Sequence, residues 1–406
     1  MSSESETAAA PVAQTARYAA DAMLDMASPQ ENYRVFMEDG GFFDTGQGFA
    51  MSYDRVNTEF VLRNQPLFSS RVEMNLGNVR PMIPLNVDPP NHSKYRKLLD
   101  PLFAPRVMNE QEEDITRRAN HYIDAFIDSG ECNFTEQFAE LFPSSVFLGL
   151  CGLPEEEMRS FLDMRDYILH PDKKVPGALE DPEKRQESLD KGADLIYGYF
   201  TDLIAKREVE PSDDLISHFL AAEVGGDKLT HEDILDIMFL FVIAGLDTVS
   251  DSLTCFFAFL AQHPEHRQQI VDDPDIIASA VEELLRWESP VPGGVPRVAT
   301  EDITLPGGQL VKEGTAVLVN YGAADIDPET FGDPFEVRFD REQNPHLAFG
   351  AGVHRCLGSH LARRELRIVL REWHRRIPNY TLKPGHEDLE YPPGLRHVKD
   401  LTLTWD

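Results

Sequence analysis

The chain carries Phe349-Gly350-Ala351-Gly352-Val353-His354-Arg355-Cys356-Leu357-Gly358, and this stretch decides how the rest of it folds. It places a cysteine in a loop with three glycines, an aromatic residue seven positions earlier and a helix-like segment directly afterwards. Glycine is favoured where a backbone takes a left-handed turn or closely approaches another group. Three glycines around one thiol therefore predict a loop wrapped against something flat and bulky.

Cys356 can play one of three chemical roles. A thiolate offered from such a loop can ligate iron, and a heme held by cysteine is suited to oxygen activation. A lone cysteine is also often a small buried hydrophobic residue. Zinc is the third role, because His354, Cys356 and His360 are ligand types at short spacings. The sequence has no second Cys/His cluster to complete a closed zinc site, so the loop favours heme-thiolate ligation.

The pattern Phe-Gly-x-Gly-x-His-x-Cys-x-Gly resembles the heme-binding loop of bacterial cytochromes P450. The resemblance extends over residues 30–406, because further motifs follow in the family's order. It implies a mainly α fold with a smaller β-rich region and a long central helix that crosses the heme. It also implies heme b (iron protoporphyrin IX) with Cys356 as the axial iron ligand, and cofactor contacts from Phe349, Gly350, His354 and Gly358.

The length, charge and cysteine content of the chain favour a globular protein that does not bind nucleic acid. With 406 residues, of which 42% are hydrophobic, the chain can build a sizeable core, and no repeat or linker divides it. The net charge of −32 argues against nucleic-acid binding, which requires a basic footprint. Widely separated cysteines form no disulfide framework and favour a reducing cytoplasm. They are Cys132, Cys151, Cys255 and Cys356.

The first residues are small and polar. They lack both the apolar core of a signal peptide and a transmembrane span. The expectation is a disordered tail over residues 1–17 and a single cytochrome P450 catalytic domain over residues 18–406. Microsomal members of the family carry a membrane anchor at this end, so the resemblance points to the soluble bacterial type.

The longest helical pattern covers residues 231–262. Thr230 is a plausible N-cap, with Asp233 at the capping-box offset. The uncharged run from Ile237 to Leu246 is too short to span a bilayer, so it predicts a buried core helix.

Inside this helix, residues 244–248 read Ala-Gly-Leu-Asp-Thr. A mid-helix glycine costs about 1 kcal/mol relative to alanine, and a buried acid or hydroxyl costs more unless it is paired. Several local rules broken together are typical of a functional site. Alternatively, Thr248 bonds back to its own helix and Asp247 sits in a salt bridge. The resemblance implies a turn opened at Ala244 and Gly245 for dioxygen, with Thr248 bonding the oxygen ligand and Asp247 relaying protons.

His92 and Arg96 lie four residues apart, so they share one face of a predicted helix. Such a pair suits paired carboxylates, although Lys94 and Lys97 nearby are equally consistent with a solvated basic face. The resemblance implies that His92, Arg96 and Arg297 hold the heme propionates.

Glu283 and Arg286 can pair on one helix face. The resemblance makes them a structural lock with Arg341, without a catalytic role. Residues 323–328 read Ala-Ala-Asp-Ile-Asp-Pro and depart from the family's usual Ala-Asn-Arg-Asp-Pro. Between these motifs, residues 303–305 and 316–319 alternate like paired strands.

The Arg-rich segment from Arg338 to Arg376 holds nine arginines and four acids, a local balance of +5. A charge run is usually a solvated face. Because this one lies on the cysteine side of the heme, it predicts docking of an acidic iron-sulfur ferredoxin, supplied by a ferredoxin reductase.

The reaction implied is hydroxylation of an unactivated C–H bond with O2 and two electrons. Residues 133–151 resemble the terpene-hydroxylating members, so a terpenoid is expected, with steroids and fatty acids as alternatives. Loop 170–185 would be the lid, and Arg80, Arg396 and His397 at the pocket mouth would favour an oxygen-bearing substrate. A peroxide-using peroxygenase and a heme-thiolate sensor without turnover are the competing functions. The expected pocket residues are Met82, Leu240, Ile243, Val295 and Leu395, with Ala244 beside them.

Overall fold

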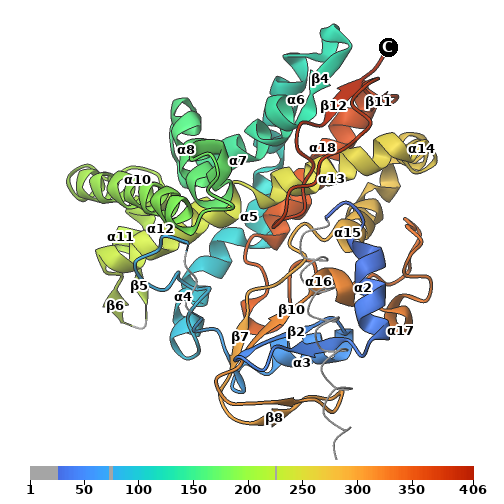
Figure 1. Ribbon diagram of the computed structural model, residues 1–406. Helices are drawn as coiled ribbons and strands as arrows, with labels where there is room; N and C mark the ends of the chain where they lie inside the picture. The colour runs from blue at the N-terminus through green and yellow to red at the C-terminus, as the bar shows by residue number, and fades with distance from the viewer. Residues whose placement is uncertain (1–25, 73–75, 225) are drawn as a thin grey trace, which may run out of the picture.

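The computed structural model describes residues 26–72, 76–224 and 226–406, so the predicted tail over residues 1–17 lies outside the described part. Helices fill most of the molecule, and the short strands form separate groups at its edges (Figure 1). The predicted class, mainly α with a smaller β region, is confirmed. No helix in the described ranges combines the length and the apolar character needed to cross a bilayer.

The largest sheet has five strands in the order β1-β2-β10-β7-β3. Strand β10 runs parallel to β2 and antiparallel to β7. The predicted pairing of residues 303–305 with 316–319 is therefore wrong, because β8 (Ile303–Thr304) pairs with β9 (Leu310–Val311) instead. Period-two alternation identifies strands but not their partners. The strands of this sheet are β1 (Phe42–Asp44), β2 (Phe49–Ser52), β3 (Phe68–Ser69), β7 (Arg297–Ala299) and β10 (Ala316–Val319).

Two smaller sheets complete the described strands. Strand β12 (Thr402–Thr404) lies between β11 (Thr381–Leu382) and β4 (Glu131–Asn133). The second is the hairpin of β5 (Glu223–Val224) and β6 (Asp227–Lys228).

The helices divide between an early and a late group. The early helices are α2 (Pro29–Glu38), α3 (Arg55–Arg63), α4 (Asn91–Leu99), α5 (Pro105–Glu110), α6 (Glu112–Asp124), α7 (Leu141–Cys151), α8 (Met158–Leu169), α9 (Pro171–Lys174), α10 (Pro182–Val209) and α11 (Leu215–Ala221). The late helices are α12 (His231–Gly245), α13 (Thr248–Gln262), α14 (Pro264–Asp272), α15 (Ile277–Glu288), α16 (Tyr321–Ala324), α17 (Pro328–Phe331) and α18 (Ser359–Arg376).

Segment 170–185 is more helical than the expected lid loop. Pro171 and Pro182 are the first residues of α9 and α10. Proline is well tolerated at that position because its missing N–H has no helical partner there. The Asp181 side chain caps α10, which runs for 28 residues. The prolines therefore begin two helices, and only His170 and residues 175–181 of this segment remain non-helical.

The central helical pattern divides into α12 and α13, which enter two different hydrophobic clusters. Helix α12 begins at the predicted capping box of Thr230 and Asp233 and packs with α8 and α10. Helix α13 packs with α15 and α18 around the fully buried Trp373. Phe134 and Phe257 approach the Trp373 ring at centroid distances of 5.1 and 5.0 Å, in the edge-on geometry that aromatic rings prefer. The junction of α12 and α13 is thus held from both sides.

Candidate active site

The cysteine loop owes its shape to two glycines. Gly350 and Gly352 have φ angles of 64° and 70°, in the left-handed region that favours glycine. A Cβ atom on Gly352 would lie 2.1 Å from the Leu62 carbonyl oxygen, so no other residue fits there. Gly358 differs, because a Cβ built on it meets no protein atom within 4 Å. The open space beside Gly358 can accept a bulky group next to the sulfur.

Cys356 is the exposed cysteine, whereas the other three are buried. Its backbone N–H donates to the Phe349 carbonyl oxygen at 2.9 Å, which closes the loop. Although the residue keeps an exposed surface, enough protein surrounds the sulfur for burial to raise the pKa of the thiol. The Gly358 N–H and the charge of Arg96 oppose that rise. A cation at the sulfur would reverse the balance, since a coordinating thiol is deprotonated outright.

A cluster of basic side chains lies beside the loop. The rings of His92 and His354 are 4.0 Å apart, and His354 Nε2 is 2.8 Å from Ser70 Oγ. Burial, followed by the charge of Arg96, lowers the pKa of His92 to about 4. Burial and then His92 lower the pKa of His354 to about 3. Both imidazoles are therefore neutral at neutral pH, and the positive charge of the cluster comes from arginines.

Two groups of this cluster lack the partners that burial demands. Buried His92 Nε2 has no hydrogen-bond partner. Arg297 is buried as well, yet its recorded partners are the Val295 and Pro296 carbonyl oxygens, and within the described ranges no carboxylate oxygen lies within 4.0 Å of it. A buried charge normally requires an opposite charge. Arg96 adds a third donor and bonds the Arg355 carbonyl oxygen at 3.0 Å. This donor set fits a flat ligand with two carboxylates beside Cys356.

The helix break lies where residues 244–248 predict it. Helix α12 ends at Gly245 and α13 begins at Thr248. A Cβ atom on Gly245 would lie 2.7 Å from the Phe147 ring, so the glycine is required by close packing against α7. Thr248 Oγ1 donates to the Ala244 carbonyl oxygen at 3.2 Å, which is the back-bonded alternative. Ala244 and Thr248 both keep accessible surface.

Asp247 is buried and held by two partners that the sequence did not reveal. His170 Nε2 lies 2.9 and 3.1 Å from its carboxylate oxygens, and Arg165 Nη1 lies 3.4 Å away. Burial alone would raise the pKa of Asp247, but His170 and Arg165 outweigh burial and hold that pKa well below its usual value. The salt-bridge alternative and the break in the helix therefore occur together.

The structural lock is assembled as the resemblance implied. Arg286 Nε and Nη2 donate to the two Glu283 oxygens at 2.9 and 2.8 Å. Arg341 Nε donates to the same oxygens at 2.9 and 3.0 Å. Asn344 Nδ2 adds a bond at 2.9 Å.

Asp325, in the segment that departs from the family pattern, is fully buried, and its backbone carbonyl oxygen accepts a hydrogen bond from Arg286 Nη1. It accepts the Leu347 N–H at 2.7 Å and lies 3.7 Å from Arg55 Nη1. Burial, opposed by His346 and Arg55, raises the pKa of Asp325 to about 6. Since the usual value for aspartate is about 3.9, folding favours the protonated form.

Asp325→Asn is expected to stabilise the protein more at pH 8 than at pH 5. The folded state binds more protons than the unfolded state between the two pKa values, so the free energy of unfolding falls as pH rises through about 4 to 6. The neutral amide of the asparagine can still accept the Leu347 N–H, and its charge does not change with pH. We therefore expect the variant to be more stable than the parent at pH 8 by about 2 kcal/mol, a figure that already subtracts the lost ion pair with Arg55. Urea unfolding of parent and variant at both pH values measures this difference in the free energy of unfolding. An equal difference at pH 5 and pH 8 would show that Asp325 ionises normally.

A cavity of about 1530 Å³ adjoins the helix break. Asp247 lines it. Of the expected pocket residues, Leu395 lines it, whereas Met82, Leu240, Ile243, Ala244 and Val295 do not. Met82 and Ile243 are buried in the cluster around α12. Leu240 and Val295 are only half-buried.

Of the three side chains expected at the pocket mouth, only His397 lines this cavity. Arg80 is bound to Asp236 at 3.0 Å. Arg396 is buried in an ion pair with Glu288 at 2.9 Å. Both arginines therefore already have carboxylate partners inside the fold.

The arginines of α18 do not form the unpaired patch that local composition predicted. Arg363 and Arg367 pair with Glu282 at 2.7 and 3.2 Å. Arg364 and Arg371 pair with Glu112. Arg376 pairs with Asp124 of α6 at 2.5 Å. These partner acids come from α15 and α6, far away in sequence, so a local charge count misses them. Arg375 pairs with Glu372 of its own helix at 2.7 Å.

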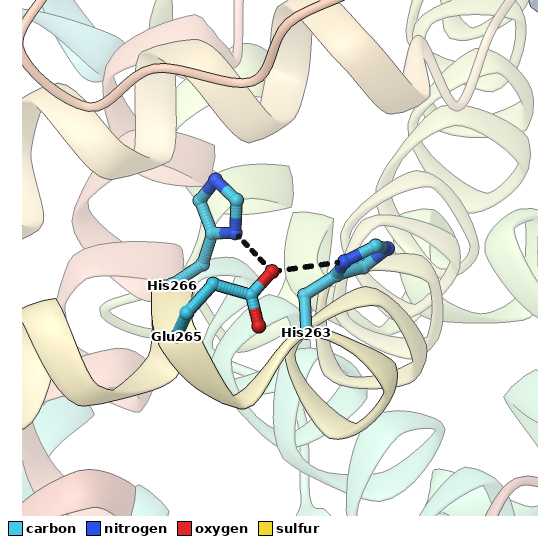
Figure 2. A group of neighbouring side chains, drawn as sticks. All are labelled: His263, Glu265 and His266. Carbon is cyan, nitrogen blue, oxygen red and sulfur yellow. Dashed lines mark hydrogen bonds and ion pairs between the residues drawn. The ribbon is translucent and has the colours of Figure 1, made fainter.

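The zinc alternative finds no support around Cys356. Within the described ranges, the one group of three ligand atoms close enough to hold a metal ion is His263, Glu265 and His266, where α14 begins (Figure 2). Glu265 Oε1 lies 3.3 Å from Nδ1 of each histidine. His354 and His360 do not form such a group with the thiol.

Comparisons with known proteins agree with this geometry. The cytochrome P450 family model matches residues 178–391. The chain is 33% identical over 383 residues to mycinamicin IV hydroxylase/epoxidase of Micromonospora griseorubida, covering 92% of this chain and 88% of that protein. It is 34% identical over 328 residues to steroid C26-monooxygenase of Mycolicibacterium smegmatis, covering 79% and 78%.

A solved structure gives the same answer for the fold. Cytochrome CYP109E1 of Bacillus megaterium in complex with testosterone superposes with a TM-score of 0.85 at 28% identity, covering 94% of this chain and 99% of that one. The glycine-bounded Cys356, the basic cluster beside it and the break between α12 and α13 are thus found in a chain that aligns with P450 enzymes along most of its length. The chain belongs to the cytochrome P450 family, and it is a monooxygenase with a heme-thiolate cofactor.

Proposed function

We propose that this monooxygenase hydroxylates an unactivated C–H bond of a hydrophobic isoprenoid, with a terpenoid as the first candidate and a steroid as the second. The balanced reaction converts RH, O2, two protons and two electrons into ROH and water. The observation that carries the heme-thiolate part of this proposal is that the exposed Cys356 lies beside buried His92 and Arg297. Neither of these two side chains has an anionic partner among the described residues. We assign one catalytic domain to residues 18–406 and a cytoplasmic location to the protein.

Cys356 is the proposed axial ligand of heme b. Its sulfur donates electron density that favours O–O cleavage when the heme is bound. His92, Arg96 and Arg297 bind the two propionates, and the Gly358 N–H stabilises the thiolate. The remaining loop contacts come from Phe349, Gly350 and His354.

The break between α12 and α13 at Ala244 and Gly245 would leave room for dioxygen when the heme is bound. Thr248 Oγ1, which donates to the Ala244 carbonyl oxygen in this structure, would be available to donate to that oxygen, and the ionised Asp247 carboxylate would take up protons and pass them on. The carboxylate is held in place by His170 and Arg165. Leu395, which lines the cavity beside the helix break, would supply part of the wall that places the substrate.

The substrate class rests on two supports. Residues 133–151 resemble the terpene-hydroxylating members, and one of the relatives is named a steroid C26-monooxygenase. The test is a screen of terpenoids, steroids, fatty acids and macrolides for compounds that displace the iron-bound water and shift the heme absorption band. A hit must then be hydroxylated by the reconstituted system. If only fatty acids or macrolides bind and turn over, the isoprenoid assignment is wrong.

Electron supply distinguishes the competing functions. A peroxygenase would turn over faster with hydrogen peroxide than with ferredoxin and its reductase, and a sensor would turn over with neither. The buried Asp247 beside the open turn at Gly245 favours O2 reduction, because this chemistry needs proton delivery and a sensor does not. Comparing the two turnover rates on one substrate decides among the three.

We assign the ferredoxin docking site to the surface formed by α4 and the cysteine loop, in place of α18. Lys94 and Lys97 on α4 are exposed, and so is Arg355 next to Cys356. No ion pair is recorded for these three cations within the described ranges, and the bond from Arg96 to the Arg355 carbonyl joins α4 to the loop. Free cations beside the sulfur suit an acidic iron-sulfur ferredoxin.

Replacing Lys94 and Lys97 together by glutamate is expected to slow reduction by ferredoxin about tenfold at low salt, with less difference at high salt. Lys312→Glu is the matched control, because Lys312 is paired with Asp302 on the β8–β9 hairpin. Stopped-flow reduction at several ionic strengths measures the effect. Equal slowing by all of these substitutions would mean that net charge, not a site, governs docking.

A further inference from the structure

Behind the helix break lies a second pair of ionisable groups that the proposed function does not use. Asp251, one turn beyond Asp247, is buried, and its Oδ2 has no hydrogen-bond partner. His397, from the C-terminal segment, places Nδ1 3.8 Å from Asp251 Oδ1. The His397 and His170 rings are nearly perpendicular at a centroid distance of 5.3 Å. His397 therefore lies beside both His170 and Asp251, without a hydrogen bond to either.

These four side chains share one compartment. Asp247, Asp251, His170 and His397 all line the cavity of about 1530 Å³. The same cavity is lined by exposed side chains, among them Lys173, Lys399 and Asp400. The cavity thus joins the buried carboxylates to the protein surface, and it is large enough to hold a chain of water molecules.

The bond directions fix which ring nitrogens carry protons. His170 Nε2 faces only carboxylate oxygens, which accept, so this nitrogen carries a hydrogen. Nδ1 of the same ring is then the acceptor in the neutral imidazole. His397 Nδ1 donates to the Leu395 carbonyl oxygen at 3.0 Å, so its Nε2 is the acceptor. His170 can therefore take up a proton at Nδ1 and release one from Nε2 to Asp247, whereas the Nδ1 hydrogen of His397 is held by a backbone carbonyl that cannot take up a proton.

The charges around the histidines support this direction of transfer. Burial, followed by Asp247, raises the pKa of Asp251 well above its usual value, so Asp251 holds a proton at neutral pH. Burial lowers the pKa of His397, so this ring is neutral and ready to accept. The charged groups that surround this cluster are Arg165 and Asp166 on α8, Lys173 on α9, Glu140 before α7, Asp247 and Asp251.

Resting on the monooxygenase function proposed above, we propose that His170 is the proton donor to Asp247, and that water in the cavity beside His397 and Asp251 resupplies His170. In each transfer the His170 Nε2–H bond breaks and an O–H bond forms on Asp247, while Nδ1 takes up a proton from a cavity water. Two such transfers provide the two protons that each turnover consumes. The electrons come from the redox partner and do not pass through this cluster.

His170→Gln tests the relay, because the glutamine amide can donate a hydrogen bond to Asp247 but cannot take up and release a proton. We expect the product formed per electron pair to fall about tenfold, the low end for a lost proton donor because cavity water can partly replace it. Hydrogen peroxide should rise correspondingly, and the rate ratio between H2O and D2O should increase. His397→Gln leaves the bond between His170 and Asp247 intact and should change these quantities little.

His263→Gln is the matched control, since His263 is exposed and lies outside the site (Figure 2). A second readout needs no turnover: in the carbon monoxide complex, the NMR signal of the His170 ring should shift in Asp247→Asn. If His170→Gln keeps the parent's product yield and isotope ratio, His170 only positions Asp247 and the relay is wrong. If His170→Gln fails to fold, His170→Asn and the NMR shift decide. A parent that lacks a heme-thiolate spectrum would instead overturn the proposed function itself.

Discussion

Cys356→Ala is expected to abolish the strongly red-shifted absorption band of the reduced, carbon monoxide-bound protein and to reduce hydroxylation by at least about 1000-fold. The band and the chemistry depend on the same electron donation from a thiolate sulfur. Alanine leaves the iron without its axial sulfur, while the loop keeps its shape through the bond from the residue 356 N–H to the Phe349 carbonyl and through Gly350 and Gly352. The measurement is the difference spectrum of the purified protein at equal heme content.

Cys132→Ala provides the control. Cys132 is buried in strand β4, and its thiol pKa is raised to about 12 by burial, so it is an inert core thiol at neutral pH. This variant should keep the band and lose only a little stability. A parent without heme, or a Cys356→Ala protein with an unchanged band, would remove the basis of the whole functional account.

Short-range sequence patterns predicted the parts of the site that are built locally. The left-handed turns at Gly350 and Gly352 and the capping box at Thr230 and Asp233 depend on residues within one turn of each other. Such features follow from backbone geometry, which the sequence determines directly.

The parts that sequence analysis missed depend on contacts between distant segments. His170 contacts Asp247 across 77 residues, and Glu112 neutralises Arg364 across 252. Gly245 is required by the Phe147 ring, which no pattern near residue 245 could reveal. Charge counts failed for the same reason, because ion pairs form between elements that only the tertiary fold brings together.

Glu283 and its neighbour Glu282 form a natural test of what burial contributes to ion pairs. Both carboxylates bind two arginines. Glu283 is fully buried with Arg286 and Arg341. The Glu282 side chain keeps 22% of its surface exposed while it binds Arg363 and Arg367. Two adjacent residues on α15 therefore differ mainly in their access to water.

Glu283→Gln is expected to cost about 3–5 kcal/mol of the free energy of unfolding, against about 1 kcal/mol for Glu282→Gln. The glutamine leaves two buried guanidinium groups without a counter-charge, and its NH2 group faces their N–H donors. At position 282 water can solvate the released arginines. Because domains of this kind are stable by only 5–15 kcal/mol, the Glu283 variant should also lose heme at lower temperature. Urea unfolding of both variants, followed by far-ultraviolet circular dichroism and heme absorbance, measures the difference. Equal losses would show that burial does not decide the strength of this lock, whereas a loss confined to Glu283→Gln would identify it as the contact that holds the segment around Arg341 onto α15.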